Sequence, residues 1–153
     1  MFDTHVDTLY VWVALGTVSV AVFGVVVSLP ASAPPDATAT AATVDEVATS
    51  PAGSVATREL DAVEWSLSDR EIGLRSDGGV AHATVFEPFV PALDGRLAAV
   101  LEGGRPSRYF GSPTGLRRAA ERARTADTGW RPAPERLTVR HVAWGGVDVT
   151  LVG

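Results

Sequence analysis

Histidine is the first residue type in this sequence that could perform chemistry. The chain has His5, His82 and His141, and the last two fall in alternating runs, where they could face one another across a sheet. A metal site would need a third ligand, Asp or Glu, at a suitable place, and the spacing supplies none. We therefore expect no metal site, and we expect these two histidines to pack against strands and titrate near neutral pH.

Motifs for phosphate binding and nucleophilic catalysis are also missing from the sequence. It contains no GxxxxGK[ST] loop, HExxH, GxSxG or GxGxxG. The Gly-Gly pairs at 78–79, 103–104 and 145–146 fit turns. There is no Cys, which excludes disulfide scaffolds, thiolate metal sites and thiol catalysis. We expect no catalytic residue, no cofactor and a protein that is not an enzyme.

Arginines on one helix could form an interaction surface. Ser112-Pro113 is a cap followed by proline at the first helical position, and it predicts a helix to about Ala126. Four basic residues lie on its polar side: Arg117, Arg118, Arg122 and Arg124. They could bind an acidic partner, anionic lipid headgroups or the acidic half of the chain. They could equally form a solvated face with Arg117–Glu121 as an i,i+4 pair.

The aromatic residues of the C-terminal half have two possible roles. These residues are Tyr109, Phe110, Trp130 and Trp144. We expect them to fill the core of a small domain that is poor in Leu and Ile. The alternative is a platform on which a ligand stacks.

Charge is divided unevenly along the chain. The 18 acidic residues outnumber 13 basic ones, all Arg, and the net charge is −5. Residues 36–94 carry 11 acidic residues and 3 Arg, whereas residues 96–140 carry 10 Arg and 4 acidic residues. The overall acidity argues against a nucleic-acid partner. The two halves could neutralise each other inside the fold or drive head-to-tail contact between subunits.

Capping residues and the spacing of apolar residues predict the helices and strands that position these side chains. Asp36 can cap a helix over 37–49, and residues 51–59 read as a loop. Three alternating runs follow, at 63–67, 71–75 and 80–86, with Asp77-Gly78-Gly79 as a hairpin turn. They predict a three-stranded antiparallel meander.

The rest of the chain predicts further helices and a closing hairpin. Asp94 caps a short helix over 95–101 that precedes the arginine-bearing helix. Runs 137–144 and 147–151 alternate on either side of Gly145-Gly146 and form a C-terminal hairpin. The predicted fold class is therefore α+β: a small domain of antiparallel strands, with a three-stranded meander, a C-terminal hairpin and two to three helices.

An uncharged run of 21 residues, from Leu9 to Leu29, precedes this domain. About 20 apolar residues cross a bilayer as a helix. We therefore divide the chain into an N-terminal tail (1–8), a single transmembrane helix (9–29), a Pro-rich linker (30–35) and an α+β domain (36–153). Small residues repeat along one face of the span and could pack against a partner helix or a second copy: Ala14, Thr17, Ala21, Gly24 and Ser28.

A secretory signal peptide is the main alternative to this anchor. Ala31-Ser32-Ala33 follows the run as a cleavage site would. However, the run is longer than the usual signal-peptide core, the tail has no basic residue, and Pro34 would follow the cut bond. We therefore favour a single-pass protein of the cell membrane. The first basic residue after the run, Arg58, is too distant for the positive-inside rule to set the orientation of the span. We place the domain outside the cell.

Several segments resemble an uncharacterised haloarchaeal family across essentially the whole chain. They are LYVWV, PPDA, LRSDGGVAHATV, RYFGSP and WRPAPERLTVRHVAWGGVDVTLVG. Members of that family tend to be encoded beside type IV pilus-like and type II secretion-like machinery. The resemblance implies an accessory or minor pilin-like role by association, and it transfers no catalytic residue.

The tail departs from processed archaeal pilins, since DTHVDT carries no basic residue before the apolar run. Prolines at 30, 34 and 35 would also interrupt a filament-forming helix. The sequence thus predicts a non-enzymatic, membrane-anchored structural or assembly component of a cell-envelope apparatus, with protein partners or self-association. The alternative is a membrane-tethered module that binds a small ligand or a lipid headgroup.

Overall fold

The computed structural model describes residues 10–15, 32–126 and 128–153. Contacts divide the chain into two compact units, Met1–Ser32 and Ala33–Gly153. In the first unit residues 10–15 are helical and exposed; the rest of the predicted 9–29 span lies outside the described residues. Within the described ranges, no helix combines the length and the apolar character that crossing a membrane requires.

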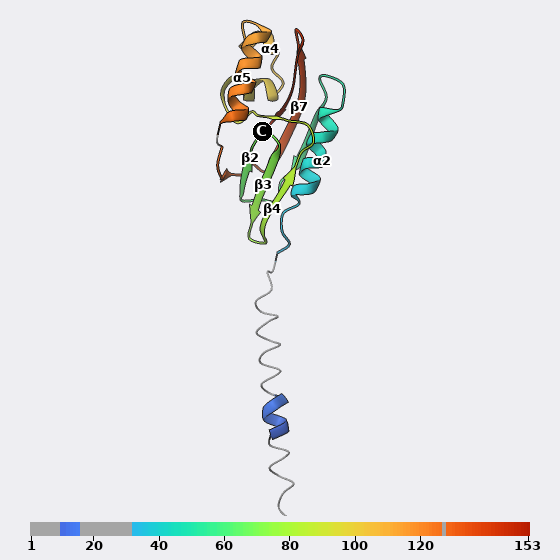
Figure 1. Cartoon of the computed structure of the whole chain (residues 1–153), viewed down its shortest axis with the longest axis vertical. Helices are drawn as coiled ribbons and strands as arrows, with labels where there is room; N and C mark the ends of the chain where they lie inside the picture. Colours follow the sequence, from blue (N-terminus) through green and yellow to red (C-terminus); the bar gives the residue numbers. More distant parts are fainter. Residues whose placement is uncertain (1–9, 16–31, 127) are drawn as a thin grey trace, which may run out of the picture. The chain divides into compact units, whose positions relative to one another are not determined.

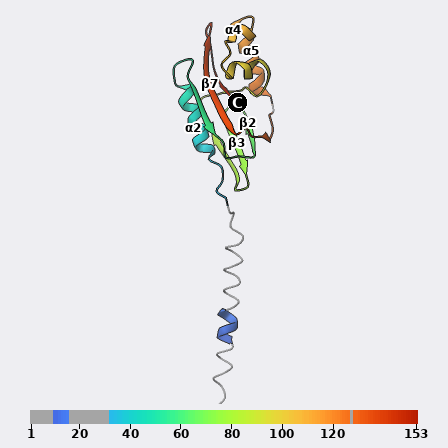
Figure 2. The ribbon, with the colours of Figure 1, turned by 180° about the vertical axis from the view of Figure 1, so that it is seen from behind.

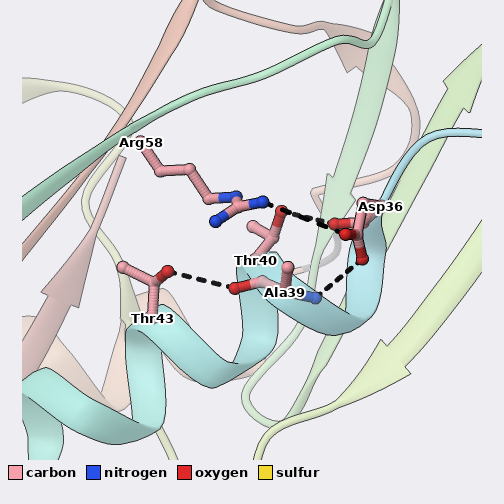
Figure 3. A network of polar contacts seen from close by, with 5 residues as sticks. All are labelled: Asp36, Ala39, Thr40, Thr43 and Arg58. Carbon is pink, nitrogen blue, oxygen red and sulfur yellow. Dashed lines mark hydrogen bonds and ion pairs between the residues drawn. The ribbon is translucent and has the colours of Figure 1, made fainter.

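Helix α2 (Ala37–Ala48) opens the second unit, and its first turn is fixed by polar contacts (Figure 3). The Asp36 carboxylate accepts the N–H of Ala39 at 2.8 Å, so it caps the helix as predicted. The same carboxylate lies 4.0 Å from the guanidinium of Arg58. Hydroxyls of Thr40 and Thr43 donate to carbonyls one turn back. The point where the linker enters the domain is therefore tied both to the helix and to the neighbouring strand.

The strands form two four-stranded sheets. The first has the order β1-β7-β8-β5, made of Val55–Glu59, Arg136–Trp144, Val147–Val152 and Val90–Pro91. The second has the order β4-β3-β2-β6, made of Gly79–Thr84, Glu71–Ser76, Glu64–Leu67 and Arg131–Pro132. All neighbouring strands are antiparallel except β5 and β8, which are parallel.

Backbone hydrogen bonds continue through the segments that link the two sheets, and both sheets contact α2. Leu60 donates to the Glu135 carbonyl, and Ala133 donates to the Val63 carbonyl, so backbone pairing continues between β1–β7 and β2–β6. Alternation along each strand turns apolar side chains toward the helix. The resulting core joins α2 to both sheets through Val44, which is fully buried, and through residues such as Trp65, Leu74 and Val139.

Three helices cover the opposite face of the β7–β8 hairpin (Figure 1). They are α3 (Gly95–Leu101), α4 (Pro106–Tyr109) and α5 (Pro113–Thr125). Their apolar residues pack against Val142, Val149 and Leu151 in a second core. Figure 2, seen from behind, again places α2 and α5 on opposite sides of β7. The β7–β8 hairpin is thus covered on both faces.

Most predicted elements are confirmed, and three expectations are wrong. The α+β class, the meander β2-β3-β4, the β7–β8 hairpin and the helices α2, α3 and α5 are present. The predicted loop over 51–59 contains strand β1, which pairs with β7. The Asp94 side chain makes no capping hydrogen bond to α3. Val63 is 63% exposed instead of contributing to the meander core, because β2 begins one residue later.

Candidate functional site

A groove between α3 and β6 is the most suitable place for a ligand or partner in the described part of the domain. Its volume is about 620 Å³, within the range of about 300–1,000 Å³ common for binding pockets. Its lining is mainly apolar and comes from β2, the segment after β5, α3, β6 and the segment after β6: Trp65, Ala92, Leu93, Ala98, Leu101, Pro132, Ala133 and Pro134. We call this site the α3–β6 groove.

Two arginines give the α3–β6 groove an unbalanced charge. Arg131, Arg136, Thr138 and Glu102 are its polar lining side chains. Among the contacts of residues 10–15, 32–126 and 128–153, neither Arg131 nor Arg136 forms an ion pair or donates a side-chain hydrogen bond. An unpaired guanidinium beside apolar surface favours a ligand with a carboxylate or another anionic group. The groove therefore suits an occupant that is apolar and negatively charged.

The β6 wall of the groove resists strand addition. The N–H of Ala133 is donated to the Val63 carbonyl on the β2 side. Its neighbours on either side, Pro132 and Pro134, have no N–H to offer outward. A partner strand would find acceptors but no donors along this edge. Recognition here must therefore depend on side chains.

The groove also lacks the groups that catalysis usually needs. Its lining side chains include one carboxylate, that of Glu102, and no histidine, serine or tyrosine. A general acid–base pair needs two titratable groups placed around a substrate. Elsewhere in the described ranges, no three His, Asp or Glu side chains gather as metal ligands would. The arrangement is suited to binding.

The four arginines predicted as an interaction surface lie on α5, with different environments. Arg117 is 3.8 Å from Glu121, the predicted i,i+4 pair. Arg122 donates to the Arg118 carbonyl, and Arg124 donates to the Phe89 carbonyl at 3.3 Å. Arg124 is thereby turned toward the domain, whereas Arg117, Arg118 and Arg122 are exposed.

Of the predicted seam, only Ala14 lies within the described residues, in the exposed helical segment 10–15. Thr17, Ala21, Gly24 and Ser28 lie outside them, as does Ala31 of the possible cleavage site. The packing of the span is therefore addressed by experiment below.

His141 is buried on β7 and linked to two acceptors. Its Nδ1 lies 2.6 Å from the Ser50 carbonyl oxygen, and its Nε2 contacts the Asp148 carboxylate. A carbonyl and a carboxylate accept hydrogen bonds, so this arrangement favours the protonated ring, in which both nitrogens donate. His82 lies on β4 in the other sheet, 3.1 Å from Glu71, so the two histidines do not face one another.

The pKa of His141 predicts how stability depends on pH. Burial lowers this pKa, but the hydrogen bonds to Asp148 and Ser50 and the Asp148 charge together raise it above 6.5. The protonated ring thus stabilises the fold fully below about pH 6.5, and this contribution is lost as pH rises through the folded-state pKa. We expect the free energy of unfolding, measured by urea titration at a series of pH values, to fall over this interval.

The matched variants are His141→Gln and His82→Gln. The His141→Gln chain should lose the decrease in stability above pH 6.5, because glutamine does not titrate. The His82→Gln chain should retain it, since His141 is unchanged. A His141→Gln curve parallel to that of the native chain would show that another group causes the pH dependence.

Trp130 is not in the core, contrary to the sequence-based expectation. It lies over the outer face of β3, where the Arg75 guanidinium is 4.1 Å from its ring centroid and His82 meets it edge-on at 5.8 Å. A Cβ on Gly73 would lie 3.1 Å from the indole, so glycine makes room for the ring. The other three aromatics match the expectation better, since Phe110 is buried and Tyr109 and Trp144 pack against the second core.

Comparison with known proteins relates the chain to a protein family. A protein-family model described as a family of unknown function (DUF7283) matches residues 3–142. No curated protein and no solved structure matches the chain.

Proposed function

We propose that this chain, which belongs to the DUF7283 family of unknown function, is a non-enzymatic, membrane-anchored assembly component of a cell-envelope apparatus. The uncharged run Leu9–Leu29 would be the single-pass anchor, and the α+β domain would present binding surfaces outside the cell. The apparatus we infer is pilus-like or secretion-like and haloarchaeal, with this chain as an accessory or minor pilin-like subunit. The sequence resemblance described above supports that finer assignment.

The α3–β6 groove is the observation that carries the proposal. It is a large site with an apolar lining and two unpaired arginines, and it lacks an acid–base pair. The contacts of Asp36 with Ala39 and Arg58 add to this argument, because they fix the start of the domain. Both features fit a positional role.

The proposal is tested by purification from membranes. A chain tagged at its C-terminus and expressed in a haloarchaeal host should co-purify, after mild detergent extraction, with pilus-like or secretion-like membrane proteins. Recovery of the chain alone as a monomer in the membrane fraction would contradict the assembly role. Recovery in the soluble fraction would contradict the anchor.

Within that experiment, Gly24→Leu tests the small-residue face of the span. Leucine would separate two helix backbones that glycine allows to approach closely, so we expect co-purifying proteins to be reduced by roughly tenfold or more. Gly24→Ala keeps a small residue and should retain them. Unchanged thermal unfolding of the domain would show that the variant is folded. Full recovery of the partners with Gly24→Leu would disprove the packing role.

A second candidate function is the binding of a small anionic amphiphile, which the unpaired Arg131 and Arg136 of the groove favour. Native mass spectrometry of the purified chain would detect such a ligand as an added mass. The double variant Arg131→Gln, Arg136→Gln should remove that mass. Persistence of the mass in the double variant would place the ligand elsewhere.

A further inference from the structure

Phe86 has the most exposed large apolar side chain among the described residues. It lies between β4 and β5 and is 81% exposed, and the neighbouring Glu87 is exposed as well. A single exposed apolar residue is common and needs no partner. Its neighbourhood, however, shows that this one is held in position. We call Phe86 and Glu87 the Phe86 corner.

The backbone of the Phe86 corner is fixed by polar contacts on both sides. The N–H of Phe86 donates to Asp45 Oδ1 at 2.9 Å, and the Glu87 N–H reaches the same oxygen at 3.4 Å. The Phe86 carbonyl accepts from Arg70 Nη1 at 3.0 Å. Fixing the backbone that carries an exposed aromatic ring reduces the ordering entropy lost on binding. The corner is therefore prepared for insertion into a complementary site.

We propose that the Phe86 corner of one copy docks in the α3–β6 groove of a second copy. The groove suits an occupant that is apolar and anionic, and the corner offers a phenyl ring directly beside a carboxylate. Glu87 would meet Arg131 and Arg136, which have no partner among the described residues. The phenyl ring would cover the apolar lining near Leu93 and Leu101.

The charge distribution of the chain supports contact between copies. Glu87 belongs to residues 36–94, which carry a net charge of −8, whereas both groove arginines belong to residues 96–140, which carry +6. At the proposed contact the opposite charges are Glu87 on one copy and Arg131 with Arg136 on the other, and such pairs guide association and favour one orientation. Phe86 does not line the groove, so a single contact of this kind joins two different surfaces and leaves a free groove on one copy and a free corner on the other. Such contacts generate a ring or an extended row of subunits.

Helix α2 connects this contact to the linker. Asp36 fixes its first turn to Arg58 on β1, and Asp45, near its last turn, holds the Phe86 corner. A row of domains joined through the corners would therefore hold their linkers at a regular spacing. This inference rests on the proposed assembly role and specifies a second copy of the chain as one partner.

The absence of native cysteine makes a crosslinking test specific. We would mix full-length Thr84→Cys chain, in which the cysteine replaces an exposed residue beside the Phe86 corner and Glu87 is kept, with full-length Glu102→Cys chain in mild detergent and oxidise the mixture. Glu102 lines the groove, and a disulfide requires Cβ atoms about 4 Å apart. We expect a mixed dimer, resolved by mass-tagging one chain, that exceeds the dimers formed by either variant alone. Arg118→Cys, exposed on α5 outside the groove, replaces Glu102→Cys in the control.

Adding Phe86→Ala to the Thr84→Cys chain should reduce the mixed dimer by roughly tenfold or more, the effect of losing an aromatic hot spot. Circular dichroism would verify that this chain is folded. Equal crosslinking to Arg118→Cys, no crosslinking, or crosslinking unaffected by Phe86→Ala would each overturn the proposed contact. The membrane co-purification experiment would be unaffected, so its result tests the assembly role separately.

Discussion

Replacing Phe89 with alanine is expected to lower the free energy of unfolding by about 3–5 kcal/mol. Phe89 is fully buried in the core that joins α2 to both sheets. Removing its ring would leave a cavity, and the closely packed side chains around it would fill that cavity only partly. Since small domains are stable by about 5–15 kcal/mol, the loss would be a large fraction of the total. Urea unfolding monitored by circular dichroism would measure it.

Phe86→Ala is the matched control, since it makes the same chemical change three residues earlier at an 81% exposed position. We expect its free energy of unfolding to stay within about 0.5 kcal/mol of the native value. The two variants would then separate a phenylalanine needed for folding from one available for contacts. A loss below about 1 kcal/mol for Phe89→Ala would show that the core around it is loosely packed.

Elements with local signals could be predicted from the sequence. Asp36 and Ser112 each accept a backbone N–H in the first turn of their helices, so the side chains that suggested the helix starts do form the caps. Gly79 and the pair Gly145-Gly146 have positive φ in the two hairpin turns, the conformation for which glycine is favoured. In each case residues a few positions apart determine the local structure.

Strand β1 could not be predicted in this way, because its partner is distant. The segment VATRE has no clear alternation of apolar and polar residues. In the structure its residues alternate between exposed and half-buried, and none is fully buried. It lies at the edge of its sheet and pairs with β7, with Val55 opposite Arg140. Strand β5 also depends on a distant partner, because it has only two residues and pairs in parallel with β8. Pairing with a strand far away in the sequence determines both elements.

The α3–β6 groove was missed for the same reason. Its lining is collected from residues between 65 and 153, and several of them are small or proline. The only local signal is the pair Arg131 and Arg136 flanking a Pro-Ala-Pro segment, which reads as an ordinary loop. The position of Trp130 had a clearer local signal in Gly73. A glycine inside a strand often indicates that another group approaches the backbone closely, and the Trp130 indole packs against Gly73.

Gly104→Ala is expected to destabilise the domain by about 1–3 kcal/mol, the usual effect of overpacking. A Cβ on Gly104 would lie 2.5 Å from the Ala99 carbonyl oxygen and would also meet the Tyr109 ring. The turn cannot easily give way, because the Gly104 N–H donates to that same carbonyl at 2.9 Å. Arg140 also donates from β7 to the carbonyls of Val100 and Gly104.

Gly111→Ala provides the control for this change. A Cβ there would meet nothing within 4 Å, and its φ is outside the left-handed region. Alanine at such a position stabilises a protein by up to about 1 kcal/mol through the unfolded chain, so we expect no loss. Thermal unfolding of both variants would measure the difference. Because the Gly104 turn ends α3, one wall of the groove, Gly104→Ala should also weaken crosslinking between Thr84→Cys and Glu102→Cys chains. Equal stability of the two variants would show that α3 shifts freely, and the groove would then be too deformable to select the Phe86 corner.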